Sequence, residues 1–122
     1  HITTFGGHPV CCAAGLAALE FILSEGLMEQ ADAKGAQYER RLVGHPAVRE
    51  IRRTGLLMGV EFGDPALTQR IVLRAVERGL MTEWFLFRDT AMRIAPPLTI
   101  TPAEIDESCD ILLDVLREVT GS

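Results

Sequence analysis

The sequence predicts an α+β fold, in which helices cover one side of a small, mostly antiparallel sheet that follows a long apolar helix. Apolar residues recur with the period of a helix in four segments and alternate with a period of two in four others. The order of these segments is helix, helix, strand, strand, helix, strand, strand, helix. A chain of 122 residues is long enough for one domain with a core of moderate size.

The first two segments are predicted to be helices. Pro9 suits the first position of a helix and Gly26 suits its end. Residues 10–25 are apolar on most faces, which is typical of a helix that packs closely against a partner surface. A second helix is expected over 27–43, with an apolar stripe formed by Leu27, Ala31, Tyr38 and Leu42.

The period then changes to that of strands. We expect strands over 48–52 and 56–62, and in the second of these Met58, Val60 and Phe62 share one face. Each of these apolar side chains alternates with a residue on the opposite face. The second strand should therefore cover a core with one side only.

A third helix is predicted to begin at Asp64 and Pro65 and to end at Gly79. Its inward stripe is expected to contain Leu67, Ile71, Val72 and Ala75. Two strands should follow, over 80–87 and 91–95, joined by a polar turn at 88–90. Pro96 and Pro97 close the last strand because proline cannot continue a central ladder.

A capping box indicates where the last helix begins. Thr101 and Glu104 have the spacing of this motif, and Pro102 occupies the first helical position. One face of the helix is apolar and the other is mainly charged. The apolar face is expected to consist of Ile105, Cys109, Leu112, Leu116 and Val119.

Composition excludes several classes of function. The net charge is −5, which argues against nucleic acid and against an anionic membrane surface as partners. No apolar stretch reaches the ~20 residues that a membrane span needs. The three cysteines, Cys11, Cys12 and Cys109, make a poor disulfide framework and favour a reducing, cytoplasmic location. The three histidines lack the spacing of metal ligands, so no metal site is expected.

Lysine is unusually scarce. Eleven of the twelve basic residues are arginines, and Lys34 is the single amine side chain. It lies in the middle of a predicted helix among charged neighbours, where a lysine is usually solvated rather than catalytic. No nucleophile elbow, P-loop or dinucleotide fingerprint is present, and we expect no catalytic residue within this chain.

A candidate anion site precedes the first helix. Thr3, Thr4, Gly6 and Gly7 offer hydroxyl groups and closely approachable backbone N–H groups where a helix begins. Such a segment can hold a phosphate. The alternative is a terminal tail that contains turn residues with no ligand, because short clusters of glycine and threonine are common.

A second candidate is Arg93, which lies in an apolar strand before the two prolines. A guanidinium group in this position could hold a substrate carboxylate by a bidentate contact. The alternative is an outward-facing residue on a half-exposed strand. The aromatic run 84–87 could likewise line a pocket, although such a run is more often a strand buried in its own core.

Three segments together resemble one family. His1–Pro9 resembles the pattern H-x-[ST]-T-[FY]-G-G-N-P, Arg52–Gly59 resembles R-G-x-G-L-[ML]-x-G, and Met92–Leu98 resembles [IV]-R-x-x-P-P-L. These patterns occur in the C-terminal part of class III pyridoxal-phosphate-dependent aminotransferases of the ornithine, acetylornithine and GABA type. The resemblance spans essentially the whole chain and implies the small domain of a fold-type I enzyme.

The resemblance implies a division of roles. Residues 1–9 would form the cofactor-phosphate loop, 10–44 connecting helices and 45–122 the small C-terminal domain. Thr4 would contact the phosphate of pyridoxal 5'-phosphate in the neighbouring subunit of a homodimer, with Thr3, Gly6 and Gly7 shaping the loop. Arg93 would bind a carboxylate of the amino acid or oxo acid. The Schiff-base lysine would lie upstream, so the chain by itself should be inactive.

The sequence departs from the family patterns at two positions, and two other classes of function remain open. His8 stands where asparagine is usual, and Arg53 stands where the pattern has glycine. A pyridoxal-phosphate-dependent aminomutase, racemase or decarboxylase of the same fold would share these features. A freestanding α+β module that binds a ligand or a partner, without any cofactor, is the alternative from another class.

Overall fold

A computed structural model describes residues 3–122, so the His1 position of the first family pattern lies outside the described residues. The chain divides into two compact units, the first ending at Gln30 and the second running from Ala31 to Ser122. In the first unit, helix α1 spans Pro9–Ser24, as the sequence predicts. No residue of α1 is buried, and large apolar side chains lie exposed along it: Val10, Leu16, Leu19, Phe21 and Leu23.

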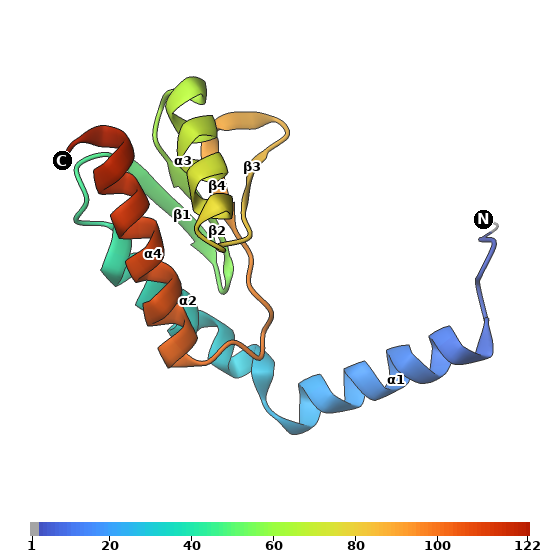
Figure 1. Cartoon of the computed structure of the whole chain (residues 1–122). Helices are drawn as coiled ribbons and strands as arrows, with labels where there is room; N and C mark the ends of the chain where they lie inside the picture. The colour runs from blue at the N-terminus through green and yellow to red at the C-terminus, as the bar shows by residue number, and fades with distance from the viewer. Residues whose placement is uncertain (1–2) are drawn as a thin grey trace. The chain divides into compact units, whose positions relative to one another are not determined.

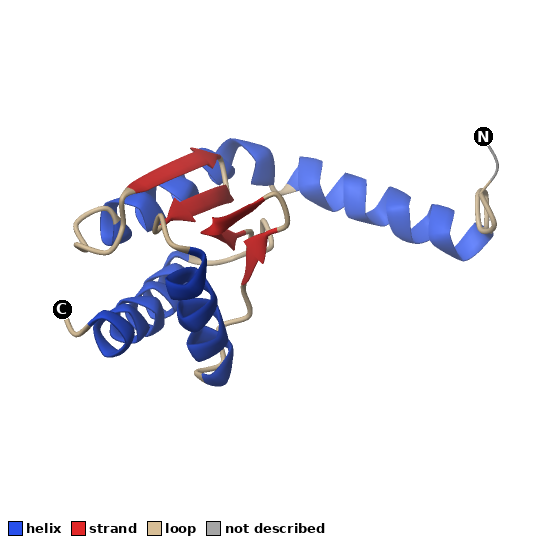
Figure 2. Cartoon of the chain, turned by 90° about the horizontal axis from the view of Figure 1, so that it is seen from above, coloured by secondary structure: helices blue, strands red, loops and turns tan. Residues whose placement is uncertain are grey.

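The second unit contains a four-stranded antiparallel sheet with strand order β1-β2-β4-β3 (Figure 1). Its strands are β1 (Glu50–Thr54), β2 (Leu57–Glu61), β3 (Glu83–Phe85) and β4 (Arg88–Ile94). The helices are α2 (Leu27–Leu42), which enters this unit at Ala31, α3 (Pro65–Glu77) and α4 (Pro102–Thr120). Figure 2 shows the strands and helices of this unit as separate layers. The predicted fold class is confirmed.

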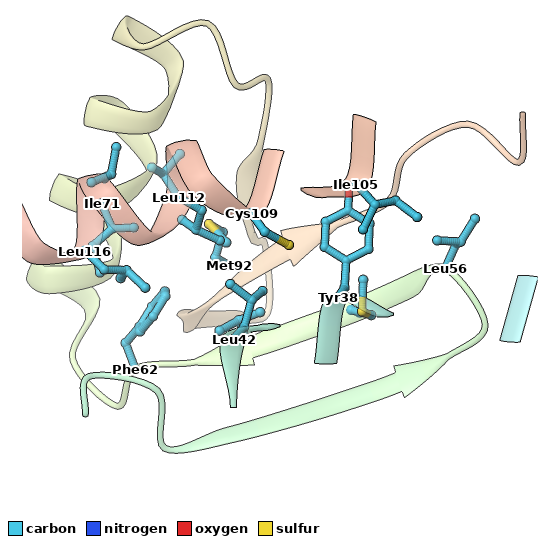
Figure 3. Packing of buried hydrophobic residues seen from close by; sticks show 14 residues of the cluster. Tyr38, Leu42, Leu56, Phe62, Ile71, Met92, Ile105, Cys109, Leu112 and Leu116 are labelled. Atoms are coloured by element: carbon cyan, nitrogen blue, oxygen red, sulfur yellow. The ribbon is translucent and has the colours of Figure 1, made fainter. Parts of the chain in front are cut away.

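One face of the sheet and all three helices share a hydrophobic core (Figure 3). Strand β2 contributes Met58 and Val60, and Phe62 follows directly, as the alternation predicts. These three side chains are at most 1 % exposed. The helices cover them with Tyr38 and Leu42 of α2, Ile71 and Val72 of α3, and Ile105, Cys109, Leu112, Val115 and Leu116 of α4.

Helix α2 approaches the turn between β1 and β2 so closely that only glycine fits. A Cβ atom on Gly35 would lie 1.9 Å from the carbonyl oxygen of Gly55, which is far inside van der Waals contact. Gly55 itself has a positive φ of 56°, a conformation that favours glycine. The two glycines together therefore set the distance between α2 and the edge of the sheet.

Arg53, which departs from the family pattern, forms ion pairs at the same contact between α2 and the edge of the sheet. Its Nε donates to Glu39 at 2.7 Å, and its Nη1 donates to the Asp32 carboxylate at 2.6 Å. Both acceptors lie on α2, and the Arg53 side chain is only 19 % exposed. Where the family pattern has glycine, Arg53 thus supplies two ion pairs between β1 and α2.

The predicted helix starts of α3 and α4 are present. The Asp64 carboxylate accepts from the backbone N–H of Ala66 at 3.0 Å. The Thr101 N–H donates to Glu104 at 2.8 Å, and the Glu104 N–H donates to the Thr101 hydroxyl, which completes the capping box. The bond from the Thr101 backbone also lowers the pKa of the Glu104 carboxyl.

The predictions for the hairpin of β3 and β4 were wrong for both strands and for the turn. The strand predicted over 80–87 spans only Glu83–Phe85. The chain reverses at Leu86 and Phe87 rather than at 88–90, and β4 begins at Arg88. Leu86 is 83 % and Phe87 is 96 % exposed, so the aromatic run is not a buried strand. Arg88 pairs with Phe85 across this two-residue turn, and its Nε forms an ion pair with Glu61 of β2.

Strand β1 begins two residues later than predicted, although the Arg49 N–H still donates to the Glu61 carbonyl.

Among residues 3–122, no single helix is long and apolar enough to cross a membrane. Only the consecutive helices α1 and α2 together have the length and composition of a span, and they are bent relative to the single straight helix that a span usually forms.

Candidate functional site

The predicted phosphate loop is an exposed turn that leads into α1. The backbone N–H of His8 donates to the Phe5 carbonyl at 3.1 Å, which closes the turn, and Gly7 has a positive φ of 77°. His8 is the N-cap of α1, but its side chain makes no capping hydrogen bond. The first N–H groups of the helix therefore have no side-chain acceptor from the cap.

Gly6 lies against Thr3 in this loop. A Cβ atom at position 6 would lie 2.6 Å from the Thr3 hydroxyl oxygen, so a larger residue would require that side chain to rotate. Within the described residues, the hydroxyls of Thr3 and Thr4 make no side-chain hydrogen bond of their own. The loop thus brings Thr3 next to Gly6 shortly before the start of a helix, and the role of these residues in binding an anion stays a prediction.

Arg93 lies on the face of the sheet that the helices leave open. Its cross-strand neighbours are Gly59 on β2 and Glu83 on β3, and its side chain is 44 % exposed. The guanidinium Nη2 forms an ion pair with the Glu83 carboxylate. The Thr82 hydroxyl donates to the Arg93 carbonyl at 2.6 Å and holds the start of β3 against β4. The structure therefore orients Arg93 outward with a carboxylate already beside it.

Lys34 is not the freely solvated residue that the sequence predicts. Its Nζ donates to the Leu98 carbonyl at 2.7 Å, in the loop that follows β4. Gln37, one turn along α2, donates to the Pro102 carbonyl at 3.0 Å. The single amine of the chain thus connects α2 to the segment after Arg93, and it is engaged in a structural contact.

A buried carboxylate, Glu61, lies on the open face and was not predicted from the sequence. The side chain of Glu61 is 6 % exposed and accepts from Arg52 Nη2 at 3.1 Å, from Arg88 Nε at 2.9 Å and from the Gly63 N–H at 3.0 Å. The alternation in 56–62 placed Glu61 opposite the core. Only the register with β1 and β4 reveals that two arginines enclose it.

These contacts determine the charge of Glu61. Burial alone raises the pKa of its carboxyl, but the nearby Thr90 hydroxyl, both guanidinium groups and the Gly63 N–H favour the charged form and lower the pKa to about 2. The Thr90 hydroxyl has no hydrogen-bond partner of ordinary geometry among the described residues. We therefore attribute the lower pKa mainly to Arg88, Arg52 and Gly63.

This pKa predicts a stability change in acid. Because the folded pKa of Glu61 lies below its usual value of 4.5, its stabilising contribution is complete above about pH 4.5 and is lost as the pH falls toward 2. The variant Glu61→Gln should be less stable than the parent chain at pH 7, and the difference should shrink across this window. Urea unfolding at several pH values measures it, and a difference independent of pH would contradict the assignment.

His45 and Cys109 both lie in environments that favour their uncharged forms. His45 Nδ1 accepts from the Ala47 N–H at 3.2 Å, and burial, followed by the charge of Arg117, lowers the pKa of its imidazole. Burial raises the pKa of the Cys109 thiol to about 12, so this thiol stays protonated. Within residues 3–122 there is no cluster of three or more metal-binding side chains.

Comparison with known proteins gives one consistent result. The sequence profile of the family described as aminotransferase class-III matches residues 1–116. An acetylornithine aminotransferase of Caldanaerobacter subterraneus is 41 % identical over 98 % of this chain, and ornithine aminotransferase 2 of Staphylococcus aureus is 37 % identical over 98 %. The chain spans 30 % and 28 % of the length of these two relatives.

Solved structures agree with this match. An aminotransferase of Bacillus anthracis superposes with a TM-score of 0.85 at 30 % identity, covering 97 % of this chain and 30 % of that one. An ornithine aminotransferase of Toxoplasma gondii superposes with a TM-score of 0.82 at 33 % identity, covering 99 % and 30 %. The latter structure is described as having partial occupancy of PLP at its active site.

Proposed function

Since this chain belongs to the class III aminotransferase family, we propose that it is the C-terminal part of a pyridoxal-phosphate-dependent enzyme that transfers an amino group between an amino acid and a 2-oxo acid. The observation that carries the proposal is the family match over residues 1–116, which includes all three motifs. The relatives are named acetylornithine and ornithine aminotransferases, which favours ornithine or its N-acetyl derivative as the amino donor.

The loop before α1 fits the phosphate of this cofactor. Gly6 lets the Thr3 hydroxyl approach the backbone, Thr4 supplies a second hydroxyl in the same segment, and the helix that follows has no side-chain cap. Thr3, Thr4 and Gly6 would hold the phosphate of the cofactor bound in the neighbouring subunit of a homodimer. When bound, the cofactor supplies the electron sink for the reaction, and the protein supplies binding and orientation.

Within the same proposal, Arg93 holds the carboxylate of the substrate. Its position on the open face and its two Nη groups suit a bidentate contact, provided that the substrate displaces or shares the Glu83 carboxylate. The reactive lysine would lie outside this chain, because Lys34 is engaged with the Leu98 carbonyl. The chain alone would then be inactive, with residues 1–9 as the phosphate loop, 10–44 as connecting helices and 45–122 as the small domain.

We place the enzyme in the cytoplasm. All three cysteines are free thiols, with Cys11 and Cys12 exposed and Cys109 buried, and exposed vicinal thiols persist most readily in a reducing compartment.

The test is an amino-transfer assay on the full-length protein with ornithine or N-acetylornithine as donor and 2-oxoglutarate as acceptor. Glutamate should form, and Arg93→Gln should raise KM by roughly tenfold to a hundredfold, because a charge-assisted hydrogen bond contributes about 1.5–3 kcal/mol. Arg117→Gln is the matched control, since Arg117 pairs with the neighbouring Asp114 on the exposed side of α4.

Two results would contradict the proposal. If no amino transfer occurs while another product forms, such as the racemised or decarboxylated donor, the reaction class is wrong. If transfer occurs and the Arg93→Gln variant keeps the KM of the parent enzyme, the role of Arg93 is wrong.

A further inference from the structure

A hollow of about 530 Å³ lies on the open face of the sheet. Arg93 is not among its lining residues, but it lines an adjoining hollow that shares Phe85 and Arg88. The floor of the first hollow is apolar and is formed by Leu57, Gly59 and Phe85. The ring of Phe85 lies directly over Gly59, since a Cβ atom added there would be 3.2 Å from the ring. The absence of a side chain at Gly59 therefore creates the hollow, with an aromatic ring on one wall.

Two guanidinium groups stand at the rim of this hollow. Arg52 and Arg88 both line it, and both are held by the same buried carboxylate of Glu61. Arg53 also lines it, but its guanidinium is engaged with Glu39 and Asp32. The anchored arginines are thus preorganised and lose less side-chain freedom when they bind an anion.

The hydrogen-bonding capacity of Arg88 is mostly unused. Its Nε donates to Glu61, whereas Nη1 and Nη2 have no acceptor among residues 3–122. Arg52 donates through Nη1 to Glu50 and through Nη2 to Glu61. Glu61 carries one negative charge and the two arginines carry two positive charges. The exposed Glu50, which pairs with Arg52, balances the second positive charge. The unused Nη1 and Nη2 donors of Arg88, rather than a net positive charge, are therefore what the hollow offers to an anion.

We propose that this hollow is a binding site for a small carboxylate carried on an apolar body, with the carboxylate on the free Nη groups of Arg88 beside Arg52 and the apolar body on Phe85, Leu57 and Gly59. A planar carboxylate matches the fork of a guanidinium group, and an aryl group matches the exposed ring of Phe85. The site does not depend on the proposed amino transfer, because it uses neither the phosphate loop nor Arg93.

Phenylacetate is a suitable probe, and the binding is measured on this chain from the backbone amide shifts of Gly59 and Gly63 by NMR. Phenylacetate should bind saturably. Phenylacetamide, which has the ring without the charge, and acetate, which has the charge without the ring, should each bind at least about tenfold more weakly. Equal binding of phenylacetamide or of acetate would overturn the proposal, and so would a lack of saturable binding by phenylacetate.

Variants separate this site from its neighbours. Arg88→Gln should weaken phenylacetate binding about tenfold, whereas Arg117→Gln should leave it unchanged. Phe85→Leu should weaken the binding of phenylacetate and leave that of acetate unchanged. This variant tests the apolar floor of the hollow without altering the ion pairs of Glu61. If Arg93→Gln abolishes binding and Arg88→Gln does not, the ligand occupies the proposed substrate site instead, and the inference fails.

Discussion

Replacing Phe62 with alanine should lower the free energy of unfolding by about 3–5 kcal/mol, the usual range for removing a buried phenylalanine ring. Phe62 is 1 % exposed and follows β2 directly, where its ring packs in the core with residues of α3 and α4 (Figure 3). Loss of the ring removes its dispersion contacts and leaves a cavity that a close-packed core fills only partly. Urea unfolding followed by circular dichroism measures the change.

The matched control is Phe87→Ala at the tip of the β3–β4 hairpin. Phe87 is 96 % exposed, so its truncation should change the free energy of unfolding by less than about 0.5 kcal/mol. Equal effects of the two substitutions would show that the hairpin tip is buried in solution, and the assignment of the core would then be wrong.

The second large effect is expected at Gly35, where alanine should destabilise the chain by about 3 kcal/mol, the upper part of the range for overpacking. The new Cβ would overlap the Gly55 carbonyl oxygen, which belongs to a backbone turn and cannot rotate away as a side chain does. Helix propensity acts in the opposite direction, because alanine is favoured over glycine in a helix by about 1 kcal/mol. The steric conflict decides the sign of the change.

Gly44→Ala is the control for this substitution. Gly44 follows α2 with a φ outside the left-handed region, and a Cβ atom there would meet nothing within 4 Å. The unfolding midpoint of the Gly44→Ala variant in urea should match that of the parent chain. A Gly35→Ala variant as stable as the parent would contradict the close approach of α2 to the β1–β2 turn.

Much of the fold could be predicted from local sequence patterns, because these patterns record which side of each element is buried. The alternation of Met58, Val60 and Phe62 identified the core face of β2, and Thr101 with Glu104 located the start of α4. The β3–β4 hairpin could not be predicted in the same way. Its turn falls on two apolar residues, Leu86 and Phe87, whereas the polar residues 88–90 lie in β4.

The candidate site was only partly accessible from the sequence. Family motifs identified Thr3, Thr4, Gly6 and Arg93, and their roles stay predictions until they are measured. No local pattern indicated that Glu61 is buried between two arginines or that Lys34 contacts the Leu98 carbonyl. Both contacts join segments that meet only in the folded chain: Glu61 contacts arginines of the neighbouring strands, and Lys34 of α2 contacts the loop after β4.

The uncovered apolar surface of α1 has a practical consequence for anyone who prepares this polypeptide. The exposed apolar side chains of α1 favour association between copies of the chain, so only charge repulsion between the copies opposes aggregation. Repulsion vanishes near the isoelectric point of about 5.1. Concentrated samples should therefore precipitate most readily in mildly acidic buffer and remain clearest well above that pH.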